Sequence, residues 1–263
     1  RMNITSTLLM EMLAAYIWPF TRLASMLMTM LVIGSQSVPI MVRMFYTIVL
    51  TAVIAPVLPK MPATDLFSMG GVMITSQQVL IGIAMGLISQ MLVQAFIMAG
   101  QVISMQTSLG FASMIDPLNG ESTPVVGQFY LMLGTLLFFA LDGHLTMIQM
   151  ITQSFITLPV SAEGLTISSM HAIVDFVSVL FQTALSFSLS ATIALLLINF
   201  SFGVMTRAAP QLNVFSMGFA VTMICGLFIM WASLSGFMDH FVLHWQRTQN
   251  LMCDVLALSC REP

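Results

Sequence analysis

Charged side chains are scarce in this chain. Only 6% of its 263 residues are Asp, Glu, Lys or Arg, whereas an ordinary soluble domain contains about 25%. The seven basic residues are scattered singly, so the chain has no basic stripe of the kind that binds a phosphate backbone. This shortage of charge argues against nucleic acid as a partner and indicates that water is not the protein's main solvent.

Cysteine is rare as well. Cys225 lies in an apolar stretch, and Cys253 and Cys260 lack the C-x-x-C spacing of metal or redox motifs, so we expect no structural disulfide. The short motifs of zinc proteases, α/β-hydrolases, P-loop enzymes and dinucleotide-binding proteins are also missing. We therefore expect neither enzymatic activity nor a cofactor.

Two histidines, His240 and His244, stand four residues apart, which is one metal-ligand spacing on a helix. No further ligand type stands beside them. Their neighbours Phe241 and Trp245 are typical of the aromatic belt at a membrane interface. We favour the belt over a metal site and expect no bound metal.

Hydrophobic residues dominate the chain, at 58%. Stretches long enough to cross a hydrocarbon core of about 30 Å, which takes ~20 helical residues, recur along its length. We predict six of them: 13–33, 38–58, 72–98, 125–141, 172–205 and 212–243. The first continues for a full span after Glu11 without a signal-cleavage pattern, so we expect it in the mature protein. Short connections rich in Pro, Gly and Ser predict an all-α, membrane-associated fold of helical hairpins.

Two of these stretches carry polar faces, of which the first is uncharged. At 100° per residue, one stripe contains Gln90, Gln94, Gln101, Ser104 and Ser108. A second stripe contains Asp175, Ser178, Gln182 and Ser186. Unsatisfied amides in hydrocarbon cost several kcal/mol each, so both faces must meet protein or water. They predict either hydrogen bonds between helices, with Gly82 and Gly86 permitting close approach, or the wall of a lumen.

Single cations accompany the apolar stretches. Arg22 and Arg43 lie near the ends of aromatic or apolar segments, where we expect their long side chains to reach the membrane interface. Arg207 is the clearest cation of a connection. Because short cytoplasmic loops are enriched in Lys and Arg, it favours a cytoplasmic position for the connection that follows.

The connection at residues 110–120 differs from the others. It contains two glycines, an Asp-Pro pair and an Asn-Gly pair, together with Phe111, Met114 and Ile115. These bulky side chains could cap neighbouring helix ends or form a seal, and the residues alone leave both options open. The chain also contains 26 methionines, whose flexible thioethers fill core gaps and suit surfaces that accept many partners.

Four strings, read together, resemble one family. They are Gln106-Thr-Ser-Leu-Gly-Phe-Ala-Ser-Met-Ile-Asp-Pro117, Leu141-Asp-Gly-His-Leu145, Thr157-Leu-Pro159, and Arg207-Ala-Ala-Pro-Gln-Leu-Asn-Val-Phe215 followed by Gly218-Phe219. The chain resembles FliR, the flagellar export-gate family whose injectisome relatives are called SctT, over residues 2–258. The R-x-x-P-Q-x-N-x-F string is the most specific part.

This resemblance implies a fold of bent hairpins that joins several FliP-like and FliQ-like subunits in a hetero-oligomeric helical ring. An FlhB-like protein would pack against the ring. The assembly would form the entrance gate of a type III secretion channel for unfolded polypeptides, in the bacterial inner membrane at the flagellar basal body. Residues 1–167 would be the FliP-like region, including loop 110–120, and residues 168–263 the FliQ-like hairpin with its tail.

The resemblance also implies a role for part of loop 110–120. The residues expected to plug the closed pore are Gly110, Phe111, Ala112, Ser113 and Met114.

We further predict that the connection after Arg207 binds a loop of a partner protein. Pro210 ends the helix, while Arg207, Gln211 and Asn213 supply hydrogen-bonding groups.

The alternative function, from another class of protein, is a secondary transporter for a small molecule. A transporter would require paired intramembrane charges or matching broken helices, and neither is found in the sequence.

Overall fold

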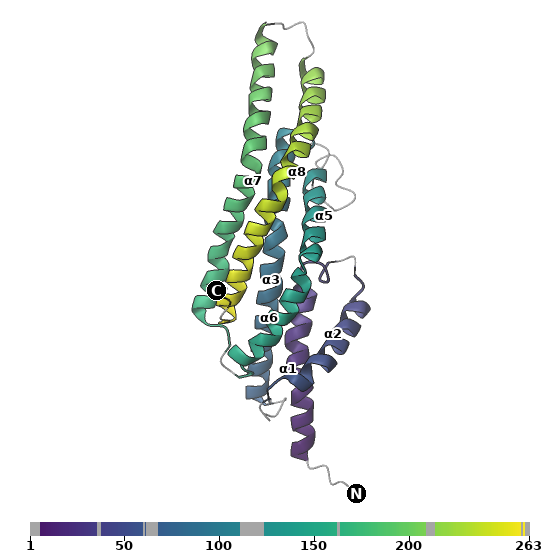
Figure 1. The fold of residues 1–263 in the computed structure, drawn as a ribbon, viewed down its shortest axis with the longest axis vertical. Helices are drawn as coiled ribbons and strands as arrows, with labels where there is room; N and C mark the ends of the chain where they lie inside the picture. The colour runs from purple at the N-terminus through teal and green to yellow at the C-terminus, as the bar shows by residue number, and fades with distance from the viewer. Residues whose placement is uncertain are drawn as a thin grey trace. The chain divides into compact units, whose positions relative to one another are not determined.

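The structure, a computed structural model, describes residues 6–35, 38–59, 61, 68–110, 124–161, 164–208, 214–258 and 260. These residues form α1 (Ser6–Thr29), α2 (Ile40–Ile54), η1 (Ala55–Val57), α3 (Met69–Gln106), α5 (Val125–Ala140), α6 (Gly143–Thr157), α7 (Ile167–Ala208) and α8 (Val214–Val255), as Figure 1 shows. No strand occurs among them. The predicted all-α fold is confirmed.

Most of the predicted apolar stretches are helices of membrane-spanning length. In the part of the chain that the structure describes, four segments are long and apolar enough to cross a membrane: Ile40–Val57, Met69–Gln106, Ile167–Ala208 and Gly218–Val255. The pair α5 and α6, bent by 63°, could form a fifth. Helix α1 exists but is not among these segments, so the span predicted over residues 13–33 is not confirmed. Its sequence contains Thr21, Arg22 and Ser25, which lower its hydropathy.

The sequence did not predict the bend between α5 and α6, because no helix was expected between residues 141 and 172. Asp142 adopts a left-handed conformation with φ 53°, which Asp tolerates better than most residues. Its carbonyl accepts hydrogen bonds from the amides of Leu145 and Thr146, both at 3.0 Å, and so starts α6. A Cβ on Gly143 would lie 2.5 Å from the Phe138 ring. The bend therefore needs glycine at this position.

The chain forms two compact units. Unit 1 comprises residues 1–91, 138–177 and 247–263, and unit 2 comprises residues 92–137 and 178–246. Helices α3, α5, α7 and α8 each contribute residues to both units. The predicted boundary between residues 167 and 168 falls at the beginning of α7 and stays a prediction.

The core of unit 1 is an apolar cluster between α1, α3 and α6. It consists of Ala14, Trp18, Ile74, Phe155 and Val160. Helices α1 and α3 approach closely beside it. A Cβ on Gly82 would lie 2.4 Å from the Arg22 carbonyl oxygen, and one on Gly86 would lie 2.8 Å from the carbonyl carbon of Thr29. The predicted close approach at these two glycines is confirmed.

The core of unit 2 is aromatic. Rings of Phe96 (α3), Tyr130 (α5), Phe187 (α7) and Phe237 and Phe241 (α8) meet at centroid distances between 4.9 and 6.1 Å, the range of favourable ring contacts. All five side chains are buried. The cluster joins four helices of different sequence regions.

The interfacial aromatic belt predicted around Phe241 and Trp245 is wrong, because both side chains are buried inside the protein. The neighbouring histidines also face protein groups. His240 packs against the Phe187 ring at 5.6 Å, and His244 Nδ1 lies 3.1 Å from the Thr183 hydroxyl. These pairs show that α7 and α8 run antiparallel within unit 2, as Figure 1 illustrates.

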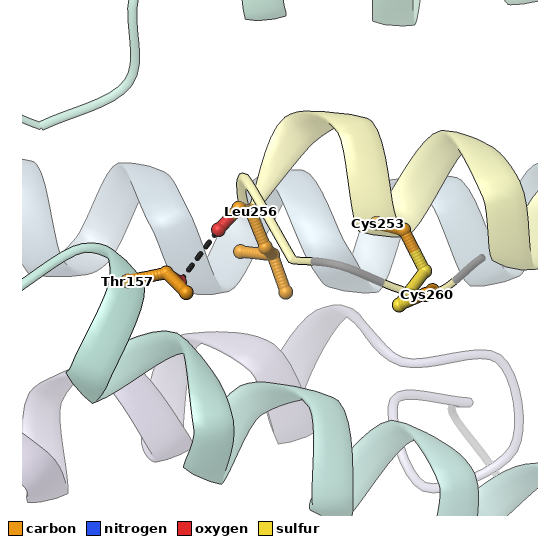
Figure 2. The surroundings of a disulfide bond; sticks show 4 residues. All are labelled: Thr157, Cys253, Leu256 and Cys260. Carbon is orange, nitrogen blue, oxygen red and sulfur yellow. Dashed lines mark hydrogen bonds between the residues drawn. A yellow bond between two sulfur atoms is a disulfide. The ribbon is translucent and has the colours of Figure 1, made fainter.

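The absence of a structural disulfide, expected from the sequence, is also wrong. Cys253, in the last turn of α8, is bonded to Cys260 with a Cα–Cα distance of 5.9 Å. Figure 2 shows the bond beside the end of α8. Spacing motifs do not reveal this pair, because it depends on how the chain reverses after the helix.

Candidate functional site

The predicted polar stripe of α3 is divided between exposed and buried positions. Gln90 and Gln94 are exposed, and the Gln90 Nε2 donates a hydrogen bond of 2.8 Å to the Thr29 carbonyl of α1. Gln101 is half-buried, whereas Ser104 is fully buried, and its hydroxyl has no hydrogen-bond partner among the described residues. The stripe therefore does not form one continuous face on the single chain.

The far end of this stripe forms part of an anchored loop base, which we define as residues 106–110. Ser108 adopts φ 63°, and its hydroxyl lies 3.4 Å from that of Thr222 in α8. Asn199 of α7 donates a hydrogen bond of 3.3 Å to the Gln106 carbonyl. Sequence reasoning missed Asn199 and Thr222, because single polar residues on apolar helices carry no motif. The loop base is therefore held by α7 and α8 within unit 2.

The plug prediction concerns the last residue of this base and the four residues that follow it. Gly110 is described and half-buried, whereas Phe111, Ala112, Ser113 and Met114 lie outside the described residues. The structure accordingly fixes where loop 110–120 begins. Their role in plugging the pore stays a prediction.

The second polar stripe forms one exposed face of α7. Asp175, Ser178, Gln182 and Ser186 are all exposed. The opposite side of the helix is buried, with Phe176, Leu180, Ala184, Phe187, Ala191 and Leu195 in the cores. At Gln182 and Ser186, the polar face therefore points away from the described parts of its own chain. On a helix of membrane-spanning length, such a face requires water or another subunit.

Arg207 is exposed in the last turn of α7, where a cation interacts favourably with the helix dipole. Pro210, Gln211 and Asn213, the other predicted docking residues, lie outside the described residues. Arg207 is thus placed at the helix end from which the predicted docking connection starts.

A buried polar site surrounds Arg22 in unit 1. The side chain has 0% exposure, so the predicted position at a membrane interface is wrong. Its guanidinium donates hydrogen bonds to the Gln78 Oε1 at 2.7 Å, the Ser154 hydroxyl at 2.9 Å and the Leu158 carbonyl at 3.0 Å. It also lies 4.1 Å above the centre of the Phe155 ring, a cation–π distance. Arg22 ties α1 to α3, to α6 and to the segment after α6.

The guanidinium of Arg43 also forms hydrogen bonds, and its partners are close to it in the sequence. Its guanidinium donates hydrogen bonds to the carbonyls of Val38, at 3.0 and 2.8 Å, and Ser35. These carbonyls belong to the connection before α2. Arg43 therefore orders the entry of the chain into that helix.

The sequence profile of the bacterial export proteins, family 1, matches residues 13–248. The chain is 33% identical to the flagellar biosynthetic protein FliR of Escherichia coli (strain K12) over 259 residues, covering 97% of this chain and 98% of that protein. It is also 33% identical to FliR of Pectobacterium carotovorum subsp. carotovorum over 245 residues, covering 92% of each chain.

The chain is therefore an integral membrane protein of a bacterial export apparatus. It belongs to the FliR family of bacterial export proteins. This membership favours the export role over the alternative of a small-molecule transporter.

Proposed function

We propose that this chain is the FliR-type subunit of the flagellar type III export gate in the bacterial inner membrane, at the basal body. It assembles with FliP-like and FliQ-like subunits around a channel for unfolded polypeptides, and an FlhB-like protein docks at the connection after Arg207. The family of export proteins and the FliR relatives support this proposal.

The observation that carries the proposal is the exposed polar face of α7. Gln182 and Ser186 of this face are exposed and uncharged, and they lie on a 42-residue helix whose neighbouring surface is apolar. Hydrocarbon cannot cover such a face, because each unsatisfied polar group would cost several kcal/mol. For the exposed amide of Gln182, neighbouring subunits of a hetero-oligomer supply such partners. The face therefore supports an assembled gate rather than a single chain in lipid.

Loop 110–120 closes this gate in our proposal. Its base at residues 106–110 is anchored to α7 and α8 by Asn199 and Thr222, so the loop starts from a fixed point. Phe111 and Met114 offer apolar bulk without charge, and an apolar constriction can stay free of water. Ring and thioether contacts are individually weak. A polypeptide in transit can displace them and they can form again.

Deletion of residues 111–114 tests the plug. Cells that contain the altered gate should assemble it normally but should leak small ions, as measured by membrane conductance. The matched control replaces Phe111 and Met114 by Leu, which keeps apolar bulk and should keep the membrane tight. Wild-type tightness of a correctly assembled gate lacking residues 111–114 would refute the plug.

A further inference from the structure

The segment after α8 is folded back onto the helix that precedes it. Helix α8 ends at Val255, and Ala257 adopts a left-handed φ of 52°. The Leu258 amide donates to the Cys253 carbonyl at 2.8 Å, and the Ala257 amide donates to the Asp254 carbonyl at 3.3 Å. This pair of bonds is a Schellman cap, which reverses the chain direction. The reversal brings Cys260 back beside Cys253.

The reversed segment is also fixed to α6. The Thr157 hydroxyl donates a hydrogen bond of 2.6 Å to the Leu256 carbonyl (Figure 2). Cys253 is only 4% exposed, and Val255 and Leu256 are buried beside it. The two sulfur atoms are thus brought together by packing and hydrogen bonds of the surrounding fold. The Cα–Cα distance of 5.9 Å is typical of disulfides.

A disulfide indicates which compartment this part of the chain faces, because disulfides persist in oxidising compartments and are rare in the cytosol. In a bacterium, the oxidising compartment lies on the outer side of the inner membrane. We infer that the end of α8 with Cys253 and Cys260 faces this outer side and is oxidised there by a disulfide-donating protein. The inference does not depend on the proposed function.

The oxidation is a thiol–disulfide exchange. The thiolate of one cysteine attacks a sulfur of the donor's disulfide and displaces the donor's other sulfur, forming a mixed disulfide. The second cysteine's thiolate then displaces the donor. The two electrons leave with the donor, which departs as a dithiol, and the two protons lost by Cys253 and Cys260 balance its two new thiol groups.

The length of α8 fixes how its two ends are related. Helix α8 has 42 residues, or ~63 Å at 1.5 Å per residue, about twice the hydrocarbon thickness. If it crosses the membrane, its two ends lie on opposite sides. Exposed Arg207, at the other end of the hairpin, then faces the cytoplasm. The positive-inside rule does not choose between the two orientations, because Arg247 and Arg261 lie near the cysteine end of the sequence. The disulfide decides the orientation.

The redox state can be read in the unaltered chain within its complete apparatus. Cells are quenched with acid, free thiols are blocked with N-ethylmaleimide under denaturing conditions, and the protein is reduced and treated with polyethylene glycol maleimide. We expect two polymer additions in ordinary cells and none in cells that lack their disulfide-donating protein. The Cys253→Ser control should gain none. Free thiols at the pair in ordinary cells would overturn the inference.

A second measurement tests sidedness without the disulfide. In a background with Cys225, Cys253 and Cys260 replaced by Ser, new cysteines are placed at two exposed positions, by Asp254→Cys and Thr206→Cys. A membrane-impermeant maleimide should label D254C in intact spheroplasts and T206C only after the membrane is permeabilised. The reverse pattern would overturn the inference. Motility of the cells that contain the unaltered chain reports separately on the proposed function.

Discussion

At the scale of single residues, Arg22 shows how a buried charge can be retained by uncharged partners. Its three hydrogen bonds go to an amide oxygen, a hydroxyl and a backbone carbonyl. Hydrogen bonds from a charged donor are roughly twice as strong as neutral ones. The planar guanidinium reaches all three acceptors at once, which a lysine ammonium on a flexible stem cannot do. We therefore regard Arg22 as the main polar tie of unit 1.

Replacement of Arg22 by Ala should destabilise the protein by about 3–5 kcal/mol, because it removes a buried charged donor and leaves its acceptors unsatisfied. Arg22→Lys should recover only part of this loss. The exposed cation Arg247 provides the control, and Arg247→Ala should change stability by less than ~0.5 kcal/mol. Thermal inactivation and protease resistance of the purified export complex are the measurements. Equal effects of R22A and R247A would contradict the role of Arg22.

The glycine at position 86 makes a second residue-scale prediction. A Cβ there would lie 2.8 Å from the backbone of Thr29 as well as 1.8 Å from its hydroxyl, so α1 and α3 would have to separate. Overpacking of this kind costs about 1–3 kcal/mol. Gly86→Ala should lower the thermal stability of the complex accordingly.

The control for Gly86 is Gly236, where a Cβ would meet nothing within 4 Å. Because Ala is the better helix former by about 1 kcal/mol, Gly236→Ala should be neutral or stabilising. A stable G86A protein would show that the two helices are not in close contact.

At the scale of helices, hydropathy predicted most of the fold, for a physical reason. Apolar runs bounded by Pro and Gly connections must be helical in a membrane, and α2, α3, α7 and α8 follow this rule. Helix α6 was missed because the turn residues Asp142 and Gly143 resemble the end of a span. They instead produce a bend that restarts the helix immediately. A bend within a helical pair and the end of a helix therefore have the same local sequence pattern.

Side-chain partners were less predictable than helices. The sequence indicated the stripe on α7, because spacing alone defines a helical face. It did not reveal that Asn199 and Thr222 hold the loop base, or that Cys260 returns to Cys253. These contacts join residues from different elements. They depend on packing that no single helix encodes.

The cap of α8 supports an element-scale prediction. Ala257 occupies the left-handed position of the Schellman cap, where a residue with a Cβ pays roughly 1–2 kcal/mol that Gly avoids. Ala257→Gly should therefore stabilise the end of α8 by about 1 kcal/mol, while Ala257→Val should destabilise it. Hydrogen exchange of the Leu258 amide, which donates to the Cys253 carbonyl, measures the effect directly. Faster exchange in A257G would contradict the assignment of this cap.

At the scale of the whole molecule, the surface of the chain is incomplete by itself. Large apolar side chains such as Phe181, Leu185 and Leu189 are exposed on α7, next to the polar face at Gln182 and Ser186. Lipid can cover the first kind of surface but not the second. In our proposal, FliP-like and FliQ-like neighbours cover the polar face.

The substitution Gln182→Lys distinguishes the two environments that the sequence left open for this polar face, which are contact with other helices and contact with water in a channel. If neighbouring subunits bury Gln182, a lysine there becomes a charge without a partner, at a cost of about 3 kcal/mol or more, which is roughly 100-fold in the association constant. We expect little assembled complex to be recovered when Q182K is produced with its FliP-like and FliQ-like partners. Thr206→Lys, at an exposed position beside Arg207, is the control and should assemble normally. Normal recovery of the Q182K complex would mean that this face of α7 meets water in the channel instead of protein.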